Sequence, residues 1–173
     1  MNYRIEAMEI LLNEDCLLQR YYPLLPFGKS LPEKLKKRGC ISKSDCVALS
    51  DDVLTECGLP TELIKLFRRF LVMYDVPESK FSDLADIAVS EAEKAAFRAL
   101  YLLPGVKSVR ARLYYDSGYG SLSQIAAALP EEIIRDTSET ILRRGWSLRA
   151  PLPKEVRTHI AVAKVITGFS MPE

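Results

Sequence analysis

The residue types that most often carry chemistry are few in this chain of 173 residues, which has four cysteines and one histidine. The cysteines are Cys16, Cys40, Cys46 and Cys57, with no Cys-x-x-Cys pair, and His159 lies far downstream. A structural zinc site brings its ligands in close pairs, so this spacing does not favour a metal site. Cys46 and Cys57 lie among apolar residues, and we expect them to be small core residues.

Catalytic groups are not arranged in any pattern typical of an enzyme. Apolar residues share the helical side of His159, which favours a histidine at the edge of a core over a general base. The segment Gly118-Tyr-Gly120 lacks the strand context and the third glycine of a dinucleotide loop. The acidic pairs at 51–52 and 131–132 are typical of the first turns of helices. We therefore expect no enzyme activity, no cofactor, no metal and no small-molecule substrate.

Helical periodicity organises the chain between these residues. In residues 61–74, apolar side chains recur at spacings of three and four and charged ones fall between them, which is the pattern of an amphipathic helix. No alternating β-branched run is bounded by hairpin turns. The sequence predicts an all-α protein with eight to ten mostly short helices.

Serine and proline mark the expected starts of several helices. Ser90-Glu-Ala-Glu93 has the pattern of a capping box and opens a helix that runs to about residue 102. Ser121-Leu-Ser-Gln124 repeats this pattern. Pro130 and Pro153 suit the first turn of a helix, where a missing amide costs nothing.

Composition and charge exclude several classes of protein. The chain has 24 Lys+Arg against 23 Asp+Glu and 48% hydrophobic residues, which is ordinary globular composition. A net charge of +1 excludes a globally basic binder, so any binding to nucleic acid must come from a local patch. Acidic residues interrupt the N-terminal segment, and no apolar run approaches about 18 residues. We expect a cytoplasmic protein with reduced thiols and no contact with a membrane.

Two segments follow one plan, at an offset of about 80 positions. Residues 35–53 align with residues 113–133, so that the following positions correspond: Gly39 with Gly118, Ser42 with Ser121, and 50–53 with 130–133. Each copy has the pattern of a helix, a glycine stop, a serine-capped short helix and a second capped helix. The alternative, a coincidence of pattern, stays open.

This repeat predicts two tandem modules of short helices, residues 1–76 and 77–173, joined by a helical linker. The most plausible joint is 77–81, because Asp75-Val-Pro-Glu-Ser-Lys80 breaks the helical periodicity.

Residues 102–113 read Leu-Leu-Pro-Gly-Val-Lys-Ser-Val-Arg-Ala-Arg-Leu, and Ser117-Gly-Tyr-Gly-Ser-Leu, Ile125-Ala and Pro130-Glu-Glu-Ile follow. This series resembles the helix-hairpin-helix superfamily, in which a helix runs into a Leu-Pro-Gly-Val-Gly hairpin and a second helix packs a small residue against the first. The positions that match are Leu103, Gly105, Val106 and Ala111. A weaker copy lies at 50–74, with Cys57-Gly-Leu-Pro60 as its hairpin. The whole is most similar to bacterial proteins built from paired modules of this kind.

The resemblance implies weak, sequence-independent binding to the backbone of DNA or RNA through the hairpin at 103–112. Hairpin amides would donate to a phosphate, and nearby cations would add charge. The candidate nucleic-acid-binding residues are Gly105, Lys107, Ser108, Arg110 and Arg112. Two departures weaken this phosphate grip: Lys107 stands where the family has its second glycine, and Pro60 in the N-terminal hairpin has no amide hydrogen.

A different class of function stays open beside nucleic-acid binding. Basic stretches at 29–43, 107–112 and 143–157 form either a backbone-tracking surface or ordinary solvated helix faces. Tyr114, Tyr115 and Tyr119 are expected to pack in or beside the core, with stacking on single-stranded bases as the alternative. A protein-interaction or scaffolding module would instead show a concave apolar patch or a symmetric dimer face.

Overall fold

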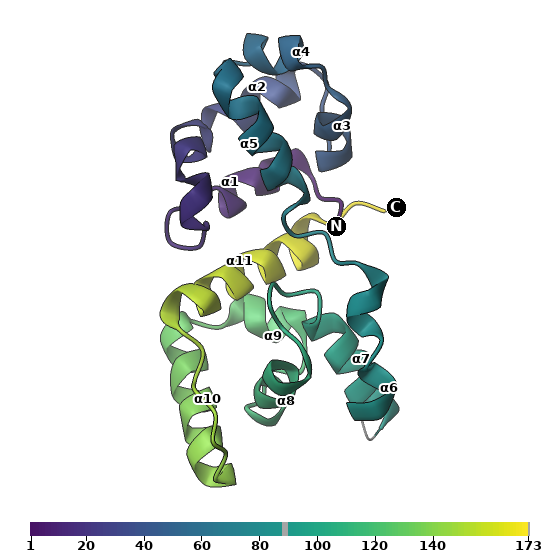
Figure 1. Cartoon of the computed structure of the whole chain (residues 1–173), viewed down its shortest axis with the longest axis vertical. Helices are drawn as coiled ribbons and strands as arrows, with labels where there is room; N and C mark the ends of the chain where they lie inside the picture. Colours follow the sequence, from purple (N-terminus) through teal and green to yellow (C-terminus); the bar gives the residue numbers. More distant parts are fainter. Residues whose placement is uncertain (88–89, 173) are drawn as a thin grey trace. The chain divides into compact units, whose positions relative to one another are not determined.

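The computed structural model describes residues 1–87 and 90–172, and these residues are mostly helical (Figure 1). Two isolated β-bridges, Tyr3 with Ser170 and Arg4 with Ser42, occur among them, and no strand does. The predicted all-α class is confirmed. No helix in these two ranges is both long and apolar enough to cross a lipid bilayer.

The chain forms two compact units. The first holds Met1–Asp75 and the chain end from Gly168 onward, and the second holds Val76–Thr167, whereas the sequence analysis divided the chain between residues 76 and 77. The helices of unit 1 are η1 (Ile5–Ala7), α1 (Met8–Leu11), η2 (Gln19–Phe27), α2 (Ser30–Lys37), α3 (Lys43–Ala48), α4 (Asp51–Glu56) and α5 (Thr61–Val72).

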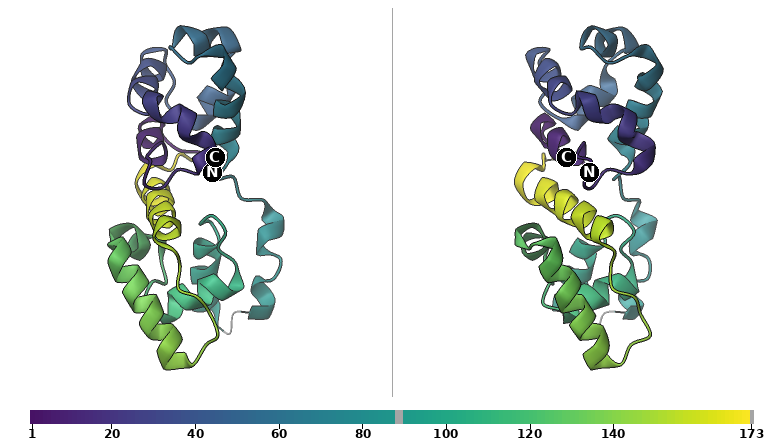
Figure 2. Two further views of the ribbon diagram at one scale, coloured as in Figure 1. Left: turned by 60° about the vertical axis from the view of Figure 1, so that its left-hand side comes forward. Right: turned by 90° about the vertical axis from the view of Figure 1, so that its left-hand side faces the viewer.

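Unit 2 contains the hairpin and the elements around it. Its helices are η3 (Glu78–Phe81), α6 (Leu84–Ile87), α7 (Glu91–Leu100), α8 (Ser108–Asp116), α9 (Leu122–Ala127), α10 (Pro130–Arg144) and α11 (Pro153–Phe169), whose last residues belong to unit 1. Helix α8 packs against both α7 and α10 (Figure 2).

The amphipathic helix predicted at 61–74 is α5, which forms one wall of the core of unit 1. Phe67 and Phe70 are fully buried, and the ring of Tyr21 from η2 meets the ring of Phe70 edge-on with centroids 6.0 Å apart. The two chain ends lie side by side in this unit (Figure 1). The Arg4 amide donates to the carbonyl of Phe169 at 2.8 Å and joins them.

The predicted helix starts are found where serine and proline mark them. The Ser90 hydroxyl accepts from the Glu93 amide at 3.2 Å, and the Ser121 hydroxyl accepts from the Gln124 amide at 3.2 Å. Pro130 and Pro153 are the first residues of α10 and α11. Each cap satisfies an amide that the helix itself leaves without an acceptor.

The predicted glycine stops have the geometry that the sequence plan requires. Gly39 has φ 89° and Gly118 has φ 93°, both in the left-handed region. After each glycine the next amide reaches back into the last turn: Cys40 donates to the Leu35 carbonyl at 3.1 Å, and Tyr119 donates to the Tyr114 carbonyl at 2.8 Å. This is the Schellman arrangement of hydrogen bonds. The local helix ends are therefore alike, while the division into two repeated modules stays a prediction.

All four cysteines are buried and free of disulfides. Cys46 is 0% exposed and Cys57 is 3% exposed, which confirms their prediction as small core residues. Burial raises the pKa of the Cys46 thiol, so this side chain stays protonated and unreactive.

A pair of glycine substitutions tests the stop after α8. A Cβ atom at Gly118 would meet nothing within 4 Å, so the cost of Gly118→Ala comes from the left-handed backbone alone, and we expect the free energy of unfolding to fall by roughly 1 kcal/mol. Gly168 in α11 has equal space and no positive φ, so Gly168→Ala serves as the control and should raise the free energy by roughly 0.5 kcal/mol. Urea unfolding of both variants measures this, and equal effects would contradict the assignment of the stop.

Candidate functional site

The hairpin between α7 and α8 turns its apolar residues into the core and its polar end outward. Leu103 and Val106 are fully buried, and so is Ala111, the small residue on α8. Gly105 has φ 71°, which turns the chain between the two helices, and it is exposed together with Lys107. The segment 91–116 therefore consists of α7, a short connection and α8, while its assignment to the helix-hairpin-helix superfamily stays a prediction.

Three inward-facing carbonyls of the hairpin are satisfied by side chains from distant elements. The Lys80 ammonium, on η3, donates to the carbonyls of Tyr101 and Leu103, the second at 2.9 Å. The Nε2 of His159, on α11, lies 2.8 Å from the Pro104 carbonyl. Burial lowers the pKa of Lys80, and the charge of Lys107 adds to this effect. The side chains of Lys80 and His159 thus supply the hydrogen-bond donors for the inward-facing carbonyls of the hairpin.

His159 is a structural residue in the core of unit 2. It is 1% exposed, which places it in the core rather than at the predicted edge. Burial lowers its pKa, so the ring is neutral and carries one hydrogen. Because Nε2 donates to the Pro104 carbonyl, Nδ1 accepts, and the Tyr114 hydroxyl donates to it at 2.6 Å. Both ring nitrogens are occupied by the scaffold.

Several backbone amides of the hairpin and of the start of α8 lack acceptors. Within the described ranges, the amides of Gly105 and of Lys107 through Arg110 have no acceptor, whereas the Val106 amide donates to the Leu103 carbonyl at 3.3 Å. The first amides of any helix lack partners inside the helix, and the helix dipole adds partial positive charge at the same end. The start of α8 therefore offers donors to an acceptor from outside the chain.

A hollow of about 470 Å³ lies beside this end of α8, and we call it the hairpin hollow. Its lining comes from the hairpin, the first turn of α8, the loop after α10 and the start of α11: Gly105, Lys107, Ser108, Val109, Arg110, Leu148, Arg149 and Glu155. Four of the five predicted site residues thus share one hollow. Arg112, the fifth, does not line it.

The two predicted arginines are engaged in ion pairs within the chain. Arg110 pairs with Glu155, with Nε and Oε1 3.1 Å apart, and so ties α8 to α11. Arg112 pairs with Glu93 at 2.8 Å and lies over the ring of Phe97, with Cζ 4.7 Å from the centroid, which ties α8 to α7. Their charges are largely offset before any ligand arrives.

Two other cations at the hairpin hollow remain uncompensated. Lys107 and Arg149 are exposed, and neither has an acidic partner in the part of the chain that the structure describes. Arg149 supplies its backbone carbonyl to Arg110, at 3.3 Å from Nη1, which places this loop residue beside α8. Positive charge at the hollow therefore comes from one predicted residue and one that the sequence analysis did not assign to the site.

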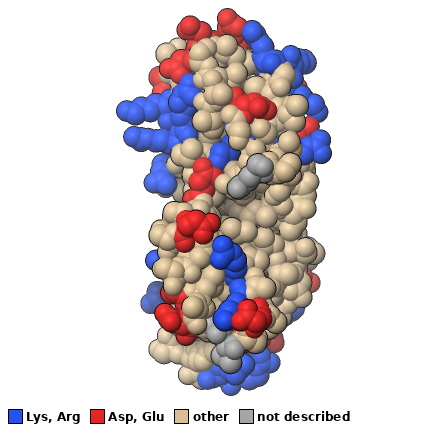
Figure 3. All heavy atoms as spheres, turned by 90° about the vertical axis from the view of Figure 1, so that its right-hand side faces the viewer, with Lys and Arg blue, Asp and Glu red and all other residues tan. Residues whose placement is uncertain are grey.

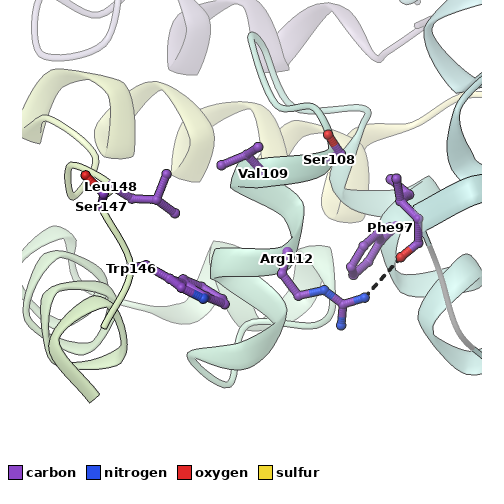
Figure 4. Close-up of a pocket in the computed structure, with 8 residues that line it drawn as sticks. Phe97, Ser108, Val109, Arg112, Trp146, Ser147 and Leu148 are labelled. Carbon is purple, nitrogen blue, oxygen red and sulfur yellow. Dashed lines mark hydrogen bonds between the residues drawn. The ribbon is translucent and has the colours of Figure 1, made fainter. Parts of the chain in front are cut away.

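A second hollow, of about 420 Å³, adjoins the first, and we call it the tryptophan hollow (Figure 4). Its lining is mostly apolar: Ile87, Phe97, Ser108, Val109, Arg112, Trp146, Ser147 and Leu148. Figure 4 shows Trp146 and Leu148, from the loop after α10, across from Val109 and Arg112 on α8. Ser108, Val109 and Leu148 line both hollows.

Sequence reasoning missed the loop residues of both hollows because they lie about 40 positions from the hairpin. The signal was weak: Trp146 and Leu148 stand in a stretch with two prolines and no helical period. The three tyrosines that the sequence analysis considered for stacking are held by the protein. Tyr114 is 0% exposed, Tyr115 meets the Phe97 ring edge-on, and the Tyr119 hydroxyl donates to Asp136 at 2.6 Å.

Half of the basic residues in the 29–43 stretch of unit 1 are paired with acids. Lys36 bonds Glu6 at 2.8 Å, Arg38 pairs with Glu56, and the buried Lys43 pairs with Asp75, so these three residues of the 29–43 stretch do not form a free cationic surface. Figure 3 shows both basic and acidic side chains on one face of the molecule, with several basic ones gathered at the upper left edge of the view. At the hairpin of unit 1, the Lys34 ammonium lies 2.6 Å from where a Cβ of Gly58 would be, so the lysine covers that glycine.

Comparison with models of known protein families found no match, and searches of curated proteins and of solved structures found none either. In the described ranges, no group of three or more His, Cys, Asp or Glu side chains is arranged to hold a metal ion.

The neutral state of His159 predicts how stability changes with pH. The pKa of His159 is lowered from its ordinary value of 6.5, so on acidification the unfolded chain binds a proton that the folded chain does not. We expect the free energy of unfolding to fall by roughly 1 kcal/mol between about pH 7.5 and about pH 5.5.

His159→Gln should be less stable at neutral pH by roughly 2 to 4 kcal/mol and should lose this pH dependence, because His159 is the chain's one histidine. Tyr114→Phe removes only the hydroxyl that donates to Nδ1, so it should keep the pH dependence. Urea titrations at several pH values measure both effects. An unchanged profile in His159→Gln would show that another group is responsible.

Proposed function

We propose that the chain binds the sugar-phosphate backbone of nucleic acid, weakly and without reading sequence, at the hairpin hollow. The observation that supports this best is the meeting, in one hollow, of amides without acceptors and of two cations without acidic partners, Lys107 and Arg149, as far as the described residues extend. Phosphate oxygens accept hydrogen bonds from such amides and are attracted by both charges. The resemblance to the helix-hairpin-helix superfamily points to the same ligand.

The number of free charges sets the expected strength of this binding. Each phosphate that a cation neutralises contributes about −0.9 to the slope of log K against log salt on duplex DNA. With Arg110 and Arg112 held in ion pairs, Lys107 and Arg149 imply a slope of about −2 per molecule. Such a site positions a backbone and cannot compete with a strongly basic protein.

Charge reversal at the hollow tests this function. Lys107→Glu and Arg149→Glu should each weaken binding to a labelled 20-nucleotide strand at least fivefold at about 50 mM salt, and should each reduce the salt slope by about one. Lys164→Glu is the matched control, because Lys164 is exposed in the same unit but does not line the hollow. Fluorescence anisotropy across a salt series measures all three. Absence of a salt slope in the unaltered chain would overturn the proposal.

Self-association or protein binding is a second candidate, favoured by two exposed leucines. Leu142 is 80% exposed and Leu152 is 70% exposed, and large apolar side chains gain free energy when a partner covers them. If they form an interface, the unaltered chain sediments as a dimer at micromolar concentration, and Leu142→Glu and Leu152→Glu restore the monomer. Sedimentation velocity decides this, and a monomer at all concentrations would count against a dimer face.

A further inference from the structure

The tryptophan hollow opens directly beside the place where the phosphates are proposed to lie. Val109 and Leu148 line both hollows and are 58% and 37% exposed. A chemical group attached to a phosphate at Lys107 therefore has an apolar surface next to it, on the far side of Val109. The hairpin hollow alone does not explain why apolar side chains stay exposed there.

The lining of the tryptophan hollow suits a flat, aromatic group. Trp146 contributes an aromatic ring, and the aliphatic side chains of Val109 and Leu148 lie across from it or beside it (Figure 4), whereas Phe97 is 1% exposed and its ring lies under Arg112. Among the described residues that line it, the charged one is Arg112, whose guanidinium is held by Glu93 at 2.8 Å and by the Phe97 ring. A volume of about 420 Å³ falls in the range of pockets that take small aromatic ligands.

We propose that the tryptophan hollow takes one unstacked base of a single-stranded nucleic acid whose phosphates lie in the hairpin hollow. This inference rests on the proposed function. The charges beside the hollow indicate which ligand fits. Lys107 and Arg149 lie next to the apolar residues that both hollows share, so a suitable ligand has a negative charge next to an aromatic group. A nucleotide has both. A base inside a duplex is paired and stacked and cannot enter, whereas a base of a single strand is free to turn out.

The proposal makes single strands the preferred ligand. Backbone contacts alone would favour a duplex or show no preference, because they do not touch the bases. Stacking on an aromatic side chain strengthens binding by on the order of tenfold per base and tolerates any base, since each has an aromatic face. The chain should therefore prefer single strands while still not reading sequence.

The experiment uses the full chain and the fluorescence of Trp146, which is its one tryptophan. Three probes are titrated at about 50 mM salt: a 12-nucleotide thymidine strand, a strand of equal length whose sugars carry no bases, and a 12-base-pair duplex. We expect the thymidine strand to quench Trp146 and to bind on the order of tenfold more tightly than the other two.

Variants separate the two hollows, with anisotropy of a labelled strand as the readout. Trp146→Ala should bring the affinity for the thymidine strand down to that for the baseless strand and leave the latter unchanged, and Trp146→Phe should restore most of the difference. Lys107→Glu should weaken both strands alike. Leu142→Ala, which removes an 80% exposed leucine outside both hollows, is the control and should change neither.

The outcomes distinguish the inference from the function on which it rests. Equal, salt-dependent binding of all three probes without quenching would overturn the base site and leave backbone binding in place. No binding of any probe would overturn both. If an acidic, aromatic peptide quenches Trp146 while no oligonucleotide does, the hollow belongs to a protein partner and the inference is wrong.

Discussion

The conformation of the hairpin depends on hydrogen bonds to the carbonyls that it turns inward. A buried carbonyl without a donor costs about 1 to 3 kcal/mol, and the carbonyls of Tyr101, Leu103 and Pro104, between α7 and α8, all accept hydrogen bonds from side chains. Lys80 and His159 supply the donors, and Tyr114 in turn holds the His159 ring in the tautomer that can donate. The amides at the start of α8 lack acceptors for a separate reason, because the first turn of a helix has no preceding helical carbonyl to receive them.

The same helix shows how charge is divided between scaffold and site. Arg110 holds α8 to α11 through Glu155, and Arg112 holds α8 to α7 through Glu93. These arginines position the hairpin, and Lys107 and Arg149 are left at the hollow. A net charge of +1 over the whole chain is therefore compatible with a small positive site, since two of the four cations at the start of α8 and the adjoining loop are matched by a carboxylate.

Features with local causes were predictable from the sequence, and features that join distant segments were not. The periodicity at 61–74, the caps at Ser90 and Ser121 and the stop at Gly118 depend on residues within one or two turns, and the structure has all of them. The partner of Arg110 lies 45 positions away, so no spacing rule could indicate that its charge is already offset. For the same reason Trp146 was not connected to the hairpin. The repeat remains a prediction, because alike helix ends arise from glycine and serine chemistry in any helical protein.

Binding at the two hollows depends differently on salt concentration, and this difference separates their contributions to the affinity. Attraction between Lys107 or Arg149 and a phosphate weakens as salt screens it, because both side chains are exposed. Contact of an apolar or aromatic group with Val109, Leu148 and Trp146 removes apolar surface from water and does not depend on screening. Binding through the hairpin hollow alone would vanish at high salt. Any affinity that persists at high salt must come from contacts with the apolar lining of the tryptophan hollow. The salt dependence of binding therefore measures how much each hollow contributes to the affinity.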